Sequence, residues 1–358
     1  MSIFFVFRRK PPAAFFEAAQ RGDAQQVKQF IKERVNLDAT NASFETGLML
    51  ALTGGHLEVA RLLLDAGAGK LTQALIEVQS GHHEIAEELL KRGADPNGKS
   101  RFGQPVLMCA TFHMASTGDS RIVELLIDHR ADIDASCALH WAAGEGDVKA
   151  VELLLSRGGR IDAMGLVKHE HDVEGGLTPL HCAVEGKRLE TTELLLSKGA
   201  PLDGTDSRGG TPLHRAAKKS QLKIMQLLVR KGASVNARTR CGETPLMIAV
   251  FGGTIDIVRP DVVRFLIESG ADVNAKDMCG QTALMLAAGM EPPWGWDIRD
   301  GWPTPWWKQE ALAGRVEALG LLVSSGALLL LKDNAGRDVL SWAVQNGATA
   351  VLSALASS

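Results

Sequence analysis

Residues 211–237 read TPLHRAAKKSQLKIMQLLVRKGASVNA, and the neighbouring stretches repeat this pattern. TPLHCAVEGKRLETTELLLSKGAPLD begins 33 residues earlier, at Thr178, and TPLMIAV begins 33 residues later, at Thr244. A fixed period of this length indicates a structural unit that is stacked many times, because one such unit cannot bury its apolar face alone. The period therefore decides the fold.

Alignment on the first position of this pattern gives ten units, of which the two end units are degenerate. They begin at Ala13, Thr46, Thr72, Gln104, Cys137, Thr178, Thr211, Thr244, Thr282 and Asp338. Each unit predicts two short helices. The opening Thr can accept from the amides of the first turn, and the Pro after it suits the first helical position. Leu222, Met225 and Leu228 follow helical spacing, and Gly232 supplies a left-handed residue at the end.

The repeated residues are similar to those of the ankyrin repeat. The resemblance rests on the TPLH-x-A opening, a Gly near the tenth place, apolar runs such as EVARLLLDAGA (58–68), and a closing Gly-Ala-Asp-Val-Asn, and it covers residues 11–356. It implies an all-α solenoid of stacked helix–turn–helix units with hairpin-like connecting fingers. It also implies that the recurring histidines His140, His181 and His214 bond to the backbone of neighbouring turns.

The repeat boundaries give the expected domain organisation. Residues 1–12 form an apolar and basic N-terminal segment, and residues 13–358 form a single array. Its degenerate caps are residues 13–45 and 338–358. The end caps must shed apolar exposure because they lack a neighbour on one side.

Departures from the period mark insertions and losses. A spacing of 41 residues predicts a long charged finger at 160–176, and one of 56 residues predicts a Pro/Trp-rich insertion at 291–313. Helix is expected to resume within residues 306–323. The unit from Gln104 is expected to have a longer turn between its helices at 113–120, and the connection at 68–70 is too short to form a finger.

The Pro/Trp-rich insertion holds five of the seven Trp residues, in PPWGWDIRDGWPTPWW (292–307). Five exposed rings would approach or exceed the largest apolar patch of an ordinary monomer. We therefore favour internal packing of most rings. The alternative is a recognition surface for a partner, since Trp is enriched among interface hot spots. Its candidate contacts are Met290, Trp294, Trp296 and Trp302.

The resemblance implies that a partner contacts the concave face, made by finger residues before each Thr and by the end of each first helix. In the units from Thr211 and Thr244 this face includes Phe251 and a basic cluster. The cluster consists of Arg208, Arg215, Lys218, Lys219, Arg238 and Arg240. Arginine pairs with carboxylates bidentately, so the cluster fits an acidic segment of a partner. The alternative is an ordinary solvated face.

The sequence contains no catalytic motif of the phosphate-binding, hydrolase or zinc-protease types, and we expect no enzyme activity, metal or cofactor. The 39 basic and 42 acidic residues are nearly balanced, so no nucleic-acid partner is expected. Five Cys residues without a CxxC pair indicate reduced thiols in the cytoplasm. Cys241 and Cys279 are expected to stay unpaired, because stacked units hold them too far apart. A monomer is expected, without integral membrane contact.

The favoured function is therefore non-catalytic protein–protein interaction, as an adaptor, scaffold or regulatory protein. Two alternatives remain. HEHD (169–172) could bind a metal and, with the 291–313 loop, form an enzymatic site, although a solvated loop is favoured. Residues 1–10 could instead attach a scaffold to a membrane surface. Asn236 and Asn274 also resemble the asparagines that asparaginyl hydroxylases modify in ankyrin proteins.

Overall fold

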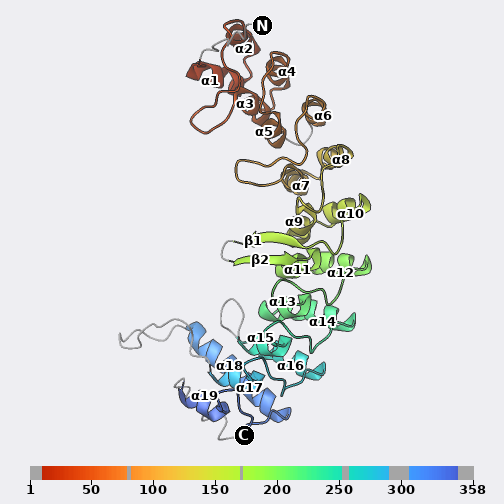
Figure 1. Cartoon of the computed structure of the whole chain (residues 1–358), viewed down its shortest axis with the longest axis vertical. Helices are drawn as coiled ribbons and strands as arrows, with labels where there is room; N and C mark the ends of the chain where they lie inside the picture. The colour runs from red at the N-terminus through yellow and green to blue at the C-terminus, as the bar shows by residue number, and fades with distance from the viewer. Residues whose placement is uncertain (1–9, 79–81, 170–171, 252–257, 290–305, 346–358) are drawn as a thin grey trace, which may run out of the picture. The chain divides into compact units, whose positions relative to one another are not determined.

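The computed structural model describes residues 10–78, 82–169, 172–251, 258–289 and 306–345 (Figure 1). Their contacts divide the chain into two compact units. The first comprises Met1–Ala142 and Lys149–Gly159, and the second comprises Ala143–Val148 and Arg160–Ser358. Both units are built from short helices in pairs, which confirms the expected repeat architecture.

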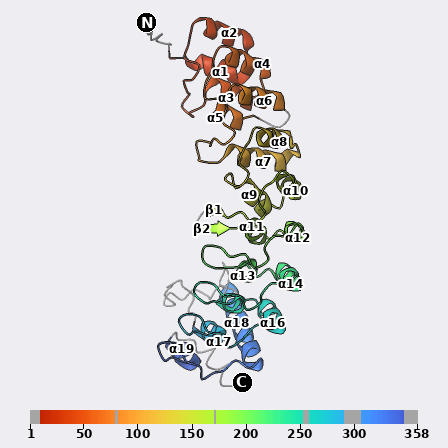
Figure 2. The ribbon, with the colours of Figure 1, turned by 45° about the vertical axis from the view of Figure 1, so that its right-hand side comes forward.

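The first unit stacks helical pairs along the chain. First helices pack on first helices, as α1 does on α3 and α5 on α7, and second helices do the same, as α2 does on α4 and α6 on α8 (Figure 2). Two further helices, α9 and α10, lie at the boundary between the units. The bounds are α1 (Ala13–Arg21), α2 (Ala24–Lys32), α3 (Gly47–Thr53), α4 (Leu57–Asp65), α5 (Leu71–Ile76), α6 (His83–Lys91), α7 (Val106–Thr117), α8 (Arg121–Asp128), α9 (Ala138–Glu145) and α10 (Val148–Ser156).

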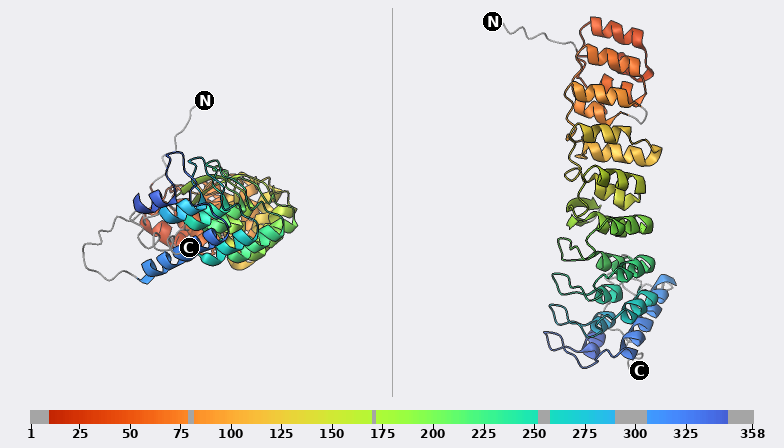
Figure 3. Two further views of the ribbon diagram at one scale, coloured as in Figure 1. Left: turned by 90° about the horizontal axis from the view of Figure 1, so that it is seen from below. Right: turned by 90° about the vertical axis from the view of Figure 1, so that its right-hand side faces the viewer.

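The second unit repeats this arrangement, with α13 packed between α11 and α15, and α14 in contact with α12 and α16 (Figure 3). A two-stranded antiparallel hairpin precedes α11. The bounds are β1 (Gly165–His169), β2 (Asp172–Leu177), α11 (Pro179–Glu185), α12 (Leu189–Ser197), α13 (Pro212–Lys218), α14 (Leu222–Arg230), α15 (Pro245–Phe251), α16 (Pro260–Glu268), α17 (Ala283–Gly289), α18 (Trp306–Ser324) and α19 (Val339–Gln345).

The repeats that open with Thr46, Thr178 and Thr244 begin as their sequence predicts. The Thr178 hydroxyl accepts from the backbone N–H of His181 at 3.4 Å, and Pro179 is the first residue of α11. Thr46 and Thr244 accept in the same way from Met49 and Met247, at 3.2 and 3.3 Å. Capping satisfies amides that have no partner within the helix.

The predicted structural role of the repeated histidines is confirmed at two positions. The Nδ1 atom of His181 accepts from Thr178 N at 3.3 Å, so Nε2 carries the proton and donates to Gly210 O at 3.0 Å. His214 repeats the arrangement with Thr211 N and Glu243 O, at 3.1 Å each. Each ring therefore connects its own helix start to the finger of the next repeat. Because burial disfavours a charged ring, the pKa of His181 falls to about 4, and that of His214 is also lowered.

The first helices are rich in small residues, which lets neighbouring repeats approach closely. Leu213, Ala216 and Ala217 are almost fully buried, and so are Met225 and Leu228 on the second helix. Helical spacing of the apolar residues in α14 is therefore confirmed. Among the residues that the structure describes, no helix is long and apolar enough to cross a bilayer.

Three expected repeat starts differ from the structure where Thr is absent or displaced. Pro12, not Ala13, is the N-cap of α1, and Pro105, not Gln104, is the N-cap of α7. The helix of the repeat before α7 begins at Leu71, and the hydroxyl of Thr72 accepts from Asp95 N at 2.9 Å instead of capping its own helix. At all three N-caps the sequence lacks the side-chain acceptor that marks a helix start.

The expected departures from regularity are recovered with one correction. Residues 165–177 form the hairpin of the long finger, and α18 does resume helix at Trp306. The extra residues expected to lengthen a turn at 113–120 instead extend α7 to Thr117, where Gly118 ends it in the left-handed conformation. The spacing of 38 residues between Thr244 and Thr282 also predicts extra residues around 254–260, and most of these lie outside the described residues.

Candidate protein-binding surface

Four consecutive connections in the second unit form fingers of one geometry, which project to the same side of the helices (Figure 3). In each, the first residue donates its N–H to the carbonyl of the fifth, at 2.9 to 3.0 Å. A glycine with φ near 78° takes the fourth place, where a side chain would be strained. The fingers are residues 206–210, 239–243, 277–281 and 333–337.

One backbone hydrogen bond joins each finger to the finger before it. Arg240 N donates to Arg208 O at 2.9 Å, and Met278 N donates to Cys241 O at 2.8 Å. Ser207 N donates to Gly175 O of the long finger at 3.0 Å, so the hairpin belongs to the same row. The bond from Arg240 N to Arg208 O places these two arginines on adjacent fingertips.

The asparagines Asn236 and Asn274 hold the base of the following finger. Asn236 donates from Nδ2 to Gly270 O at 3.0 Å and accepts at Oδ1 from Asp272 N at 2.8 Å. Asn274 makes the same pair of bonds with Gly326 O and Leu328 N. Modification of either asparagine stays a prediction.

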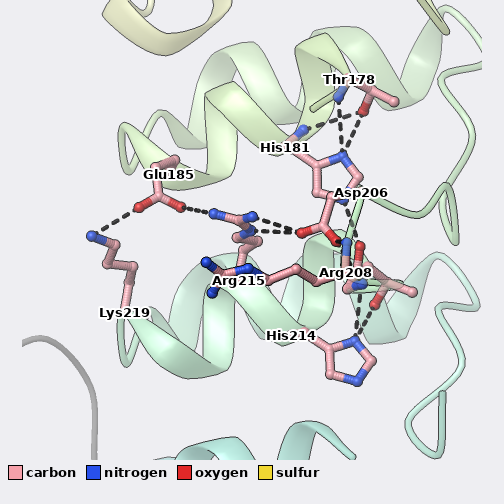
Figure 4. Close-up of polar contacts among 10 residues, drawn as sticks. Thr178, His181, Glu185, Asp206, Arg208, His214, Arg215 and Lys219 are labelled. Atoms are coloured by element: carbon pink, nitrogen blue, oxygen red, sulfur yellow. Dashed lines mark hydrogen bonds and ion pairs between the residues drawn. The ribbon is translucent and has the colours of Figure 1, made fainter. Parts of the chain in front are cut away.

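Arg215 lies in a buried charge network that joins two repeats (Figure 4). Its side chain is only 7% exposed, and Nη2 lies 2.6 Å from Oδ2 of Asp206, whose side chain is 3% exposed. Nη1 lies 3.3 Å from Oε2 of Glu185 on α11, and Lys219 Nζ lies 2.8 Å from the other oxygen of Glu185. The guanidinium is therefore bound by carboxylates of the chain itself.

Asp206 also organises its own finger. Its Oδ1 accepts from the backbone N–H of Arg208 and of Gly210, both at 2.8 Å. Burial alone would raise the pKa of Asp206, but the hydrogen bond from Arg215 and those from the finger outweigh it, so the pKa lies below its usual value. The pKa of Glu185 is lowered in the same way, because Lys219 and Arg215 outweigh the effect of burial. Both carboxylates are ionised at neutral pH.

The remaining residues of the basic cluster lie closer to solvent. Arg208, Arg238 and Arg240 are exposed, and Lys218 and Lys219 are half-buried. Arg238 donates from its guanidinium to Lys276 O on the next connection. The structure thus brings Arg208 and Arg240 together at the fingertips and places Arg215 inside, where it positions the finger that carries Arg208. Binding of a partner by these residues stays a prediction.

Other candidate contacts fall into two groups. Phe251, the last residue of α15, has an exposed side chain. Met290, Trp294, Trp296 and Trp302 lie outside the described residues, as do residues 1–9. The proposed roles of these segments stay predictions.

The proposed metal motif HEHD (169–172) lies at the tip of the long finger. His169 pairs with Asp172 across the two strands, and Glu170 and His171 lie outside the described residues. In the part of the chain that the structure describes, no group of three or more His, Cys, Asp or Glu side chains could hold a metal ion. The structure describes all five Cys residues and joins none of them in a disulfide, and Cys241 and Cys279 are exposed.

The chain belongs to the ankyrin-repeat family. The model of three-copy ankyrin repeats matches residues 15–100, 71–165, 161–239 and 235–292. Ankyrin repeats are typically protein-binding modules and are usually not catalytic. The chain is also similar to human transient receptor potential cation channel subfamily A member 1, with 25% identity over 195 residues. That match covers 52% of this chain and 14% of the channel protein.

Proposed function

We propose that this chain is a non-catalytic interaction module, with an adaptor, scaffold or regulatory role, that binds an acidic segment of a partner protein. The contact residues are Arg208 and Arg240 on adjacent fingertips, supported by Arg238, Lys218 and Phe251. The observation that carries the proposal is the hydrogen bond from Arg240 N to Arg208 O, at 2.9 Å, which holds two exposed arginines side by side.

Two exposed arginines on adjacent fingertips attract negative charge. Carboxylates of a partner could pair bidentately with each guanidinium. The rigid finger row supports this role, because side chains held in place lose little entropy on binding. The human cation channel matches this chain over only 14% of its own length, so channel activity is not part of the proposal.

The proposal can be tested with random 16-residue peptides displayed on phage and selected on the intact chain. We expect enrichment of peptides rich in Asp and Glu. Reversal of both charges in Arg208→Glu/Arg240→Glu should weaken an enriched acidic peptide at least about tenfold in fluorescence anisotropy. The matched control Lys223→Glu/Arg230→Glu reverses two exposed charges on α14, away from the fingers.

The control should leave the affinity within about twofold, because the charges it reverses lie far from the contact and are screened by salt. Selection without acidic enrichment would contradict the proposal. Equal losses in the fingertip variant and in the control would contradict it as well, since net charge alone would then explain binding.

A further inference from the structure

An aromatic groove opens on the first unit, where one finger is missing. Only five residues, 66–70, connect α4 to α5, whereas residues 198–211 connect α12 to α13. The finger at 41–45 therefore faces the finger at 100–104 across the place of the lost one, and Arg101 Nη1 donates to Ser43 O at 2.6 Å between them. The groove encloses about 440 Å³, and its floor includes Gln73 and Ile76 of α5.

Three large apolar side chains lining this groove are exposed to solvent. Phe44, Phe102 and Phe112 are 76%, 75% and 59% exposed. The exposed parts of these three side chains sum to about 400 Å² of largely apolar surface. Phe112 packs on Trp141 with a centroid distance of 5.4 Å, so the aromatic surface continues onto α9 within the first unit.

Phe44 occupies a position that favours glycine. Its φ of 65° places it in the left-handed region, where Gly103, Gly209, Gly242 and Gly280 stand in the equivalent fingers. A bulky residue in this conformation is strained, and such strain clusters at functional sites. The fold itself gains little from the ring, because most of its surface remains in water.

The charges of the groove are mainly negative. Glu45 accepts from the Asn41 amide at 3.1 Å, and Glu77 accepts from the Thr53 hydroxyl at 3.5 Å. Among the described residues neither carboxylate has an ion-pair partner. The lining also includes His113 and Arg101, and the Arg101 guanidinium stacks on Phe102 at 4.8 Å and bonds to Ser43. A cation entering between the rings would therefore meet two carboxylates and several aromatic faces.

We propose that this groove binds a partner segment in which a Lys or Arg side chain adjoins an apolar residue. The cation would lie against the ring faces, which attract it electrostatically, and pair with Glu45 or Glu77. The neighbouring apolar residue would cover Phe102 and Phe112. This surface is independent of the basic fingertips in the second unit, and it prefers the opposite charge in its partner.

The test uses random 12-residue phage-displayed peptides selected on the intact chain, followed by anisotropy with the synthesised winners. We expect enrichment of Lys or Arg beside apolar residues. Phe102→Ala/Phe112→Ala should weaken these peptides at least about tenfold, and Glu45→Gln/Glu77→Gln about five- to tenfold. Replacing the peptide's Lys by norleucine should weaken binding to the wild type about as much as Glu45→Gln/Glu77→Gln does. The norleucine peptide should then bind the wild type and this Gln variant equally well.

Three controls separate the groove from other causes. Glu58→Gln/Glu84→Gln removes two exposed carboxylates of the same unit, and Phe251→Ala removes an exposed ring of the other unit. Both, like Arg208→Glu/Arg240→Glu, should bind within about twofold of the wild type, since their charges and ring lie away from the groove. Phe44→Gly removes the ring while relieving the backbone, so weaker binding by this variant cannot be ascribed to unfolding.

Several results would overturn the proposal. One is that no basic–apolar peptide is enriched relative to selection on Phe102→Ala/Phe112→Ala. Another is that enriched peptides bind the Glu45→Gln/Glu77→Gln variant as well as they bind the wild type. Concentration-dependent self-association that disappears in Phe102→Ala/Phe112→Ala would show that a second copy fills the groove. Phenylalanine-dependent binding to phosphatidylcholine vesicles would assign the groove to a membrane surface.

Discussion

Replacing Arg215 by Met is expected to lower the free energy of unfolding of the second unit by about 2–3 kcal/mol. Removal of one partner from a buried ion pair typically costs about 3–5 kcal/mol. The lower part of that range applies, because Asp206 keeps two backbone donors at 2.8 Å and Glu185 keeps Lys219 at 2.8 Å. The apolar Met side chain recovers about 1 kcal/mol through burial in the space of the arginine stem.

Urea unfolding followed by circular dichroism measures this loss. With a slope of about 2 kcal/mol/M, the midpoint of the second unit should fall by roughly 1–1.5 M. The matched control is Arg240→Met, which removes an exposed guanidinium from a fingertip. It should shift the midpoint by less than about 0.3 M, because exposed charges contribute little to stability.

A double-mutant cycle with Asp206→Asn tests whether Asp206 is the partner of Arg215. In the wild-type background this change removes the ion pair, whereas in Arg215→Met it removes a buried carboxylate that has lost its cation. The change should therefore destabilise the first protein and stabilise the second, with a coupling energy of about 2 kcal/mol. Equal effects of Asp206→Asn in both backgrounds would refute the assignment, as would a loss in Arg215→Met no larger than in Arg240→Met.

The pH dependence of stability tests the same interaction between Arg215 and Asp206. The pKa of Asp206 is lowered in the folded chain, so its contribution is present above the unfolded value of about 3.9 and is lost as the pH falls through the folded pKa. Without Arg215 the carboxyl loses the cation that lowers its pKa, so less stability depends on its ionisation. The difference in stability between the wild type and Arg215→Met should therefore shrink as the pH falls through this range.

Three further predictions concern other residues. Because the pKa of His181 falls from 6.5 to about 4, the unfolded chain binds an extra proton between these values, and the free energy of unfolding should fall as the pH falls from about 6.5 to 4. Urea titrations at several pH values should show a weaker pH dependence of stability in His181→Gln, and an unchanged dependence would contradict the assignment. Asp333, whose pKa falls to about 2, accepts from Ala335 N, Arg337 N and Trp342 Nε1; Asp333→Asn should cost about 1–3 kcal/mol in thermal unfolding at pH 7, and an unchanged melting temperature would refute its structural role. Phe44→Gly should leave the melting temperature unchanged or raise it, whereas Phe44→Ile should lower it because a branched side chain tolerates the left-handed backbone poorly; the reverse order would show that the ring stabilises the fold.

The repeat architecture could be predicted because its determinants are local and recur. Thr178 caps its own helix start, and His181 bonds to the adjacent finger in the way that its recurrence implies. Where a repeat lacks Thr at the N-cap, the prediction slipped by one residue, from Pro105 to Gln104. Proline tolerates the same backbone conformation, but it offers no side-chain acceptor to identify the start.

The surroundings of the basic cluster could not be predicted from charge alone. Arg215 meets Asp206 nine residues earlier and Glu185 thirty residues earlier, so its burial depends on how two repeats pack. A partial signal was present, because Asp206, Asp277 and Asp333 occupy the same first place in three of the four fingers, and Thr239 occupies it in the other. The groove was missed for a different reason. Only alignment of SFET (43–46) with RGGT (208–211) shows that Phe44 stands where a glycine is expected.

The backbone bonds between fingers bear on how such a chain can change its length. Each of the four fingers donates one N–H to the finger before it, and each of the first three offers one carbonyl to the finger after it. Donor and acceptor therefore match at each junction, whichever two repeats meet there. Duplication or deletion of a whole repeat leaves no buried polar group without a partner. The number of repeats in this family can thus vary by recombination, while the side chains at the fingertips diverge separately.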